Sequence, residues 1–219
     1  MNLTVCSYFT SRKRSKDHPA WSPRIHELEP LLNSIDNVIV FHDCFNTEDP
    51  RFIRVDYDYN YVPTVYRWLV YDKYLRDIDF DKVFIVDSTD VINLKNPFDD
   101  MKNNRLYVGY EPQIIEWGWL QRKAKKFPKI KDYLNVLHRN RHRYVLNAGL
   151  VGAGRETALA FLDRLSSCHQ ANSQHKKKST CMPIFNYVAL KNFHPLTGKT
   201  VCTRFGEDEV NDISWWKHR

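Results

Sequence analysis

Short apolar runs recur along the first third of the chain, separated by stretches with helix-like spacing. Residues 3–9 are rich in β-branched and aromatic side chains and predict a strand, which leads into a polar, basic loop. Apolar positions in residues 25–35 recur at about every third or fourth place, and residues 38–41 are continuously apolar. The pattern predicts a strand, a helix and a second strand, which together make one β-α-β unit.

The middle of the chain repeats this alternation. Pro63 suits the first turn of a helix, and residues 64–75 carry apolar side chains on one face. The run Val83-Phe84-Ile85-Val86 has the unbroken apolar character of a strand that is buried on both faces, and it ends at Asp87. Two more strands are expected at residues 105–110 and 144–151, and two more helices at residues 156–165 and 183–191. The sequence therefore predicts an α/β fold with a mostly parallel mixed sheet flanked by helices.

Length and composition fit one folded domain. The chain has 219 residues, of which 42% are hydrophobic, and no repeat or linker divides it, so residues 1–219 are expected to form a single domain. No run is apolar enough to cross a membrane, and no secretory signal precedes the first strand. Five scattered cysteines, an odd number, predict free thiols and a reducing compartment. These features predict a soluble, cytoplasmic protein.

The net charge of +7 comes from local basic clusters in residues 12–14, 122–131, 139–143 and 176–178. Residues 173–180, which include the last cluster, are expected to form a surface loop. Such clusters suit a polyanion, which leaves open nucleic acid, an anionic membrane surface and the diphosphate of a nucleotide sugar.

The most specific motif is Asp87-Ser88-Thr89-Asp90, directly after the buried strand. Ligands of open α/β sheets bind beyond the carboxyl ends of strands. Ser88 and Thr89 allow a turn that brings both carboxylates together, and such an oxygen-rich site suits Mn²⁺ or Mg²⁺. The alternative is that Asp87 merely ends a strand and Asp90 caps a turn. On spacing alone, the two interpretations stand about level.

The strand with its aspartates resembles the D-x-D or D-x-x-D motif of GT-A glycosyltransferases. Two further segments agree in order: the helix that carries Arg67, and Asn147-Ala148-Gly149, which resembles the N-[AS]-G segment on the acceptor side of these enzymes. Met182-Pro183-Ile184-Phe185-Asn186 resembles the helix that follows. The motif departs from the commonest form in having two residues between its aspartates, and the acidic residue that often precedes the Phe-Asn helix is absent.

The resemblance implies a site for each substrate group. Asp87 and Asp90 would bind the metal, and His218, near the end of the chain, would complete its ligands. For His218 a basic tail without a fixed position is an equal alternative. The residues expected to contact the donor lie after the first strand, around the metal motif and near the chain end: Ser7, Tyr8, Phe9, Thr10, Arg12, Arg67, Asp87, Ser88, Asn147 and Lys217.

A catalytic carboxylate is harder to choose. Glu207 and Asp208 are the first candidates, and Asp163 and Glu111 stand behind them. Glu111, Trp117 and Trp119 are expected in a loop after a strand end, where the rings could stack on a sugar or anchor the loop in the core. An inverting reaction needs one of these carboxylates as general base, whereas the retaining reaction, which the resemblance favours, needs little beyond departure of the leaving group on the donor's front face.

These observations predict a metal-dependent transferase that moves a sugar from a nucleoside-diphosphate donor, expected to be a UDP-sugar, to a glycan or other hydroxyl acceptor. The donor would occupy residues 1–110 and the acceptor residues 111–219. The chain also resembles the amino-terminal glycosyltransferase domain of a multidomain chlorovirus protein, which would make it one domain of a larger polypeptide in the host cytoplasm, with UDP-rhamnose or UDP-glucose as donor.

Two other functions compete with this prediction. A sugar-nucleotide pyrophosphorylase shares the general fold, but it needs a glycine-rich phosphate loop after the first strand, and residues 10–17 contain no glycine. A basic nucleic-acid-binding protein would use residues 122–143 as its charged face, and the aspartate motif would then be a coincidence. Binding of nucleic acid is not expected.

Overall fold

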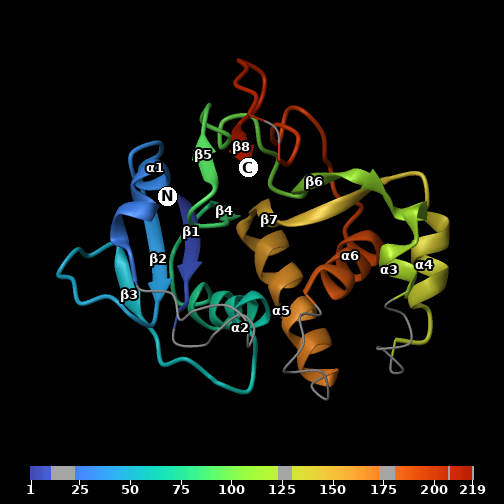
Figure 1. Ribbon diagram of the computed structural model, residues 1–219, viewed down its shortest axis with the longest axis horizontal. Coiled ribbons are helices and arrows are strands. Elements are labelled where there is room, and N and C mark those ends of the chain that lie inside the picture. Colours follow the sequence, from blue (N-terminus) through green and yellow to red (C-terminus); the bar gives the residue numbers. More distant parts are fainter. Residues whose placement is uncertain (11–22, 123–129, 173–180, 207, 219) are drawn as a thin grey trace.

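The computed structural model describes residues 1–10, 23–122, 130–172, 181–206 and 208–218. The chain alternates between strands and helices through most of its length (Figure 1). In chain order the elements are β1 (Asn2–Tyr8), η1 (Ile25–Leu28), α1 (Glu29–Leu32), β2 (Val38–His42), β3 (Phe52–Arg54), α2 (Pro63–Tyr74), β4 (Lys82–Val86), β5 (Val91–Asn93), β6 (Leu106–Ile114), η2 (Ile115–Trp117), α3 (Trp119–Arg122), α4 (Tyr133–Arg139), β7 (Tyr144–Gly154), α5 (Arg155–Ala171), α6 (Cys181–Asn192) and β8 (Trp216–His218).

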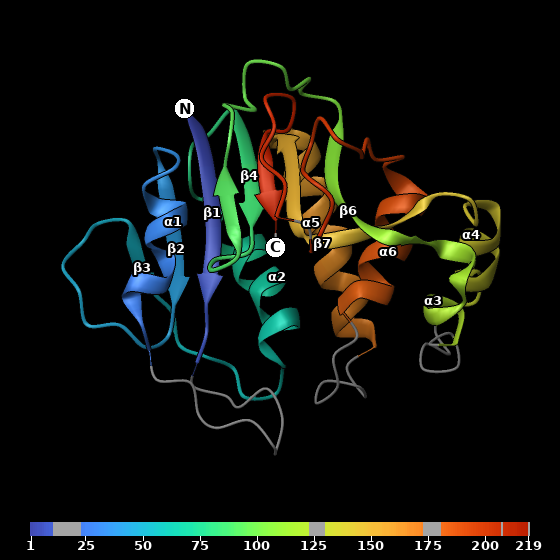
Figure 2. The same ribbon diagram turned by 45° about the horizontal axis from the view of Figure 1, so that its top comes forward.

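A six-stranded sheet with the order β3-β2-β1-β4-β7-β6 forms the centre of the fold. Strands β1 to β4 run parallel, β7 is antiparallel to β4, and β6 is antiparallel to β7, so five strands share one direction. Strands β5 and β8 pair separately as a two-stranded antiparallel ribbon. In both views this ribbon lies close to the middle of the large sheet (Figures 1 and 2). Because β1 and β4 are neighbouring parallel strands, their carboxyl ends are adjacent.

Alternation along β4 explains why this strand is apolar throughout. Val83 and Ile85 belong to a core cluster on the side of α2, α5 and α6, whereas Phe84 and Val86 belong to a second cluster that contains residues of α1 and β8. Since neighbouring residues of a strand point to opposite faces, both faces of β4 are buried. The continuous apolar run that marked this strand in the sequence is a consequence of that double burial.

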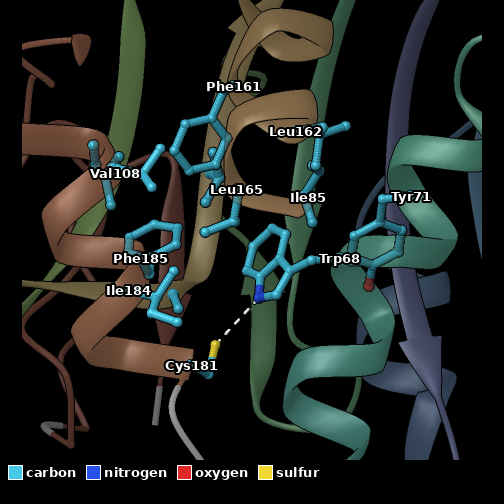
Figure 3. Packing of buried hydrophobic residues seen from close by; sticks show 14 of the residues in the cluster. Trp68, Tyr71, Ile85, Val108, Phe161, Leu162, Leu165, Cys181, Ile184 and Phe185 are labelled. Carbon is cyan, nitrogen blue, oxygen red and sulfur yellow. Dashed lines mark hydrogen bonds between the residues drawn. The ribbon is translucent and has the colours of Figure 1, made fainter. Parts of the chain in front are cut away.

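Helix α2 supplies the side chains that fix the first core cluster. It begins at Pro63, and its buried residues include Val65, Trp68 and Tyr71, which recur every three positions and so lie on one face. Trp68 is fully buried and packs against the rings of Phe161 and Phe185, and its indole N–H donates to Cys181 Sγ at 3.1 Å (Figure 3). This packing fixes the residue before Trp68, which is Arg67.

The predicted fold class is confirmed: the chain is α/β, with a mostly parallel six-stranded sheet flanked by helices. All five predicted long strands form, although β6 and β7 run several residues further than expected. The predicted first helix is shorter than expected, because η1 and α1 end at Leu32. Three short strands, β3, β5 and β8, and the helix α4 were not expected. The expected surface loop at residues 173–180 lies outside the described residues.

All five cysteines have free thiols, as predicted. No helix among the described residues has the length and apolar character needed to span a membrane.

Candidate metal centre

Asp87 follows β4 directly, and the alternation of that strand turns its side chain toward α2. Its backbone N–H continues the ladder with β7 by donating to the Gly149 carbonyl oxygen at 2.7 Å. From α2, the Arg67 guanidinium forms an ion pair with the Asp87 carboxylate and also donates to the Ala148 carbonyl oxygen at 2.9 Å. Burial alone would raise the pKa of Asp87, but the charges of Arg67 and His218 outweigh it and hold the pKa below its usual range. Asp87 is therefore ionised.

His218 reaches Asp87 and Asp90 from the far end of the sequence. Strand β8 pairs with β5, in the register Val91 to His218, and β5 starts immediately after Asp90. The imidazole is 1% exposed, and its Nε2 lies 3.6 Å from Asp87 Oδ2 and 3.8 Å from Asp90 Oδ2. Burial lowers the pKa of His218, but the two aspartates outweigh this effect and raise the pKa to about 9. Without a cation, His218 carries a proton at neutral pH.

The three side chains fit a divalent metal ion. One ligand atom from each of Asp87, Asp90 and His218 lies within 4.8 Å of the others. Neither ring nitrogen of the buried His218 has a hydrogen-bond partner within the described part of the chain, although buried polar atoms are nearly always paired. A metal ion at Nε2 would take the place of the proton there. Two carboxylates with one imidazole are a donor set for a divalent metal ion, and the donor set alone does not choose which one.

Gly149, in β7, leaves room for the side chains of this cluster. A Cβ at this position would stand 2.4 Å from both Asp87 Oδ2 and His218 Cε1, and 2.9 Å from Asn147 Oδ1. Real Cβ atoms do not approach other atoms that closely, so any side chain here would displace a predicted metal ligand. Asn147, Asp87 and His218 therefore converge on a single point of the fold that only glycine can occupy.

Two bulges in the pairing of β6 with β7 shape this region. Val108 of β6 pairs with Val151 of β7, but the next residue of β6, Gly109, pairs with Asn147. Three residues of β7, 148–150, therefore form a bulge, and Gly149 is the middle one. Tyr110 pairs with Leu146 and Ile114 with Tyr144, so the stretch of β6 between these pairs, which begins with Glu111, is longer than the facing stretch of β7. Bulges redirect side chains and are common beside active sites.

Through these bulges, Glu111 and Asn147 meet. The Asn147 side-chain amide donates to Glu111 Oε1 at 2.6 Å, and Asn147 Oδ1 accepts the Gly149 N–H at 2.6 Å. Burial is the main reason that the pKa of Glu111 is raised, with the charge of Asp87 adding to it, while the Asn147 hydrogen bond and His218 act in the opposite direction. Glu111 was expected in a loop; it instead lies within β6, where the bulge directs it toward Asn147.

The predicted donor-binding residues near the first strand differ in how deeply they are buried. Ser7 is half-buried at the end of β1, and the Thr10 N–H donates to Asp43 Oδ1 at 3.0 Å. Tyr8 and Phe9 are 3% and 9% exposed, and both belong to the hydrophobic core. The Tyr8 hydroxyl donates to Glu27 Oε2 at 3.0 Å. Donor contacts of these four residues, and of the half-buried Ser88, stay predictions.

Two further candidates near the end of the described chain, Lys217 and Asp208, pair with each other. Lys217 precedes His218 in β8 and so points to the opposite side of the strand, where its ammonium group pairs with Asp208. This direction does not favour the predicted role of Lys217 at the diphosphate, nor that of Asp208 as a catalytic group. Arg12 and Glu207 lie outside the described residues.

The contacts described for Asp163 and Trp119 lie with other parts of the fold. Asp163, on α5, has a mostly exposed side chain and pairs with Arg76 at 3.0 Å. Trp117 ends η2 and Trp119 begins α3, and the Trp119 side chain packs against the first core cluster, which favours the anchoring interpretation. A cavity of about 310 Å³ lies at the other end of the sheet, near Asn2 and Asn37, and contains none of the predicted site residues.

Comparison with known proteins adds no family. No protein-family model matches the chain, and no curated protein gives a significant match.

Proposed function

We propose that this protein is a metal-dependent glycosyltransferase that moves a sugar from a nucleoside-diphosphate donor to a hydroxyl group of an acceptor. The single observation that carries the proposal is the meeting of Asp87, Asp90 and His218 at the carboxyl edge of the sheet, with neither ring nitrogen of the buried His218 in a hydrogen bond within the described residues. The sequence motif that resembles GT-A enzymes supplies the aspartates. The proposal extends to a UDP-sugar as donor and a glycan as acceptor.

In this proposal each side chain of the site has a separate role. Asp87, Asp90 and His218 would hold Mn²⁺ or Mg²⁺, which when bound supplies Lewis-acid stabilisation of the departing diphosphate. Arg67 keeps the Asp87 carboxylate ionised and fixed in direction, because its guanidinium also bonds to the Ala148 carbonyl oxygen. Gly149, without a side chain, leaves room for the ligand side chains of Asp87 and His218 to come together. The fold thus organises charge where a leaving group needs it.

The proposed function is tested by hydrolysis of a panel of UDP-sugars in the presence of Mn²⁺. We expect the wild-type protein to hydrolyse at least one of them slowly, because water can replace an absent acceptor. Asp90→Ala should abolish turnover while circular dichroism shows an unchanged fold, since Asp90 is half-buried and ends no core element. Asp79→Ala, which removes an exposed carboxylate from the turn before β4, is the matched control and should hydrolyse normally.

Unchanged turnover in Asp90→Ala would remove the central assignment. The nucleic-acid alternative makes the opposite prediction from the transferase: no metal-dependent binding of UDP, together with tight binding to DNA or RNA that weakens steeply with salt. A pyrophosphorylase would instead release pyrophosphate from a nucleoside triphosphate and a sugar phosphate. Each of these outcomes is distinct from hydrolysis of a UDP-sugar.

A further inference from the structure

We propose that Glu111 is the group that removes the proton from the attacking hydroxyl of the acceptor, an assignment that rests on the proposed function. Glu111 lies on a β6 bulge and bonds to Asn147, whose side-chain oxygen stands beside Asp87 and His218 where the three side chains crowd against Gly149. A single amide side chain therefore separates this carboxylate from the metal cluster.

The two oxygens of the Glu111 carboxylate differ in their surroundings. Oε1 accepts the Asn147 amide at 2.6 Å, whereas the structure assigns no hydrogen bond or ion pair to Oε2 among the described residues. The residue is half-buried, so part of its surface remains accessible to a bound molecule. One oxygen thus fixes the direction of the carboxylate, and the other is available to a substrate hydroxyl.

Asn147 cannot replace Glu111 in this role. Its amide donates to Glu111, and its oxygen accepts the Gly149 N–H. A side-chain amide is also too weak a base to accept a proton. Asn147 is instead a positioning residue, which holds Glu111 on one side and the Gly149 backbone on the other.

The other acidic side chains of the cluster are held by cationic side chains. Asp87 pairs with Arg67, and the carboxylates of Asp87 and Asp90 lie 3.6 and 3.8 Å from His218 Nε2. A carboxylate held by a cation is a weaker base than one held by a neutral amide, because the cation stabilises the ionised form. Within the described residues, Glu111 is therefore the best-suited proton acceptor beside the metal cluster.

The proposed step is balanced without any further reactant. The acceptor oxygen forms a bond to the anomeric carbon of the donor sugar, while the bond from that carbon to the diphosphate oxygen breaks. The electron pair of the broken bond leaves with the nucleoside diphosphate. The hydroxyl proton passes to Glu111 Oε2 and later to solvent. Because Glu111, and not the departing diphosphate, takes the proton, the acceptor is not held on the face from which the diphosphate leaves. The assignment therefore implies attack on the opposite face and inversion, in place of the retention that the family resemblance favours.

The test compares a nucleophile that carries a proton with one that does not. With the UDP-sugar of the panel that the wild-type protein hydrolyses fastest, Glu111→Gln should hydrolyse it about 10²–10⁴-fold more slowly. Its Mn²⁺-dependent affinity for UDP should be unchanged, because Gln has the same shape and still accepts the Asn147 amide. Glu116→Gln, an exposed residue just beyond β6, is the matched control and should match the wild type.

Azide separates a chemical role from a structural one. Azide needs no base, so Glu111→Ala should form the glycosyl azide at a rate at least equal to wild-type hydrolysis, with inverted configuration. Wild-type hydrolysis by Glu111→Gln, an equal loss with azide and water in Glu111→Ala, or a glycosyl azide of retained configuration would overturn the assignment. If the wild-type protein neither binds UDP with Mn²⁺ nor hydrolyses any UDP-sugar, the proposed function itself fails, and this inference fails with it.

Discussion

At the scale of single residues, Gly149 is decisive, because the side chains of Asp87, His218 and Asn147 lie where a side chain of residue 149 would be. Gly149→Ala would place a Cβ 2.4 Å from Asp87 Oδ2 and His218 Cε1, so at least one ligand must move. We expect affinity for Mn²⁺ to fall at least tenfold, measured by isothermal titration calorimetry. Gly152→Ala is the matched variant, because its Cβ would meet the Phe84 ring at 2.4 Å, away from the ligands.

The two glycine variants should therefore separate two kinds of damage. Gly152→Ala should lower the free energy of unfolding while leaving the affinity for Mn²⁺ close to that of the wild type. Equal affinity in Gly149→Ala and the wild type would contradict the placement of the metal site beside Gly149.

His169 provides a pH prediction that is independent of the metal ligands. It is buried on α5, its Nε2 has no hydrogen-bond partner within the described residues, and burial, reinforced by Arg67, lowers its pKa from 6.5 to about 3. The unfolded chain therefore binds a proton between these values and the folded chain does not. The stability that neutral His169 contributes is complete above pH 6.5 and is lost as the pH falls below that value.

Between pH 7 and pH 5, the wild type should accordingly lose about 2 kcal/mol of stability that His169→Gln does not lose, because glutamine cannot be protonated. Urea unfolding of both proteins at the two pH values measures the difference. Parallel losses in wild type and variant would show that His169 is protonated in the folded protein.

Some residues of the site could be predicted from the sequence and others could not. Asp87 and Asp90 were recognisable because they follow a buried strand directly. His218 could be nominated only by resemblance, since nothing local distinguishes it from a basic tail. The contact of Glu111 with Asn147 depends on two β-bulges, and a bulge shifts register without leaving a periodic pattern in the sequence.

At the scale of elements, the β5-β8 ribbon is the part that the site cannot lack. Trp216 in β8 is fully buried and packs on Phe84 of β4, with ring centroids 5.1 Å apart, so it attaches the ribbon to the sheet. The sequence pattern did not predict this ribbon, because strands of three residues are too short to display alternation. The long strands and α2 were predictable, since each has a full period of buried positions.

Trp216→Ala should cost about 3–5 kcal/mol of stability, as large-to-small changes in a core do. It should also weaken Mn²⁺ binding, because His218 would lose its support. Phe161→Ala is the matched control, since Phe161 is equally buried on α5 in the other core cluster. Its loss of stability should be similar, but at a temperature where both variants are folded it should bind Mn²⁺ as the wild type does. Equal Mn²⁺ affinity in the two variants would contradict a supporting role of the ribbon.

At the scale of the whole molecule, metal binding should stabilise the fold, because His218 is far in the sequence from Asp87 and Asp90 and meets them only in the folded state. At Mn²⁺ concentrations about 100 times the dissociation constant, the gain is about 2.7 kcal/mol. For a chain of this size, this corresponds to a rise of roughly 5–10 °C in the unfolding midpoint. Scanning calorimetry with Mn²⁺ and with a chelator measures the rise, which should be absent in Asp90→Ala.

Burial on both faces of the central sheet explains why the overall architecture was predictable while the surroundings of Glu111 and Asn147 were not. The spacing of apolar residues follows which positions are buried, and the long strands and helices of the two core clusters show that spacing. The contact between Glu111 and Asn147 depends instead on irregular pairing between β6 and β7, which leaves no periodic pattern in the sequence. In the proposed transferase, the choice of sugar and acceptor would depend on the shape of the pocket that holds them.

The most direct test of the account is calorimetric titration of UDP into the protein, with Mn²⁺ and with a chelator, repeated for Asp90→Ala and His218→Ala. The account predicts binding of UDP to the wild-type protein only when Mn²⁺ is present, and loss of that binding in both variants while their folds persist. Binding of UDP that is equally tight with the chelator, or unchanged in either variant, would contradict a metal centre built from Asp87, Asp90 and His218.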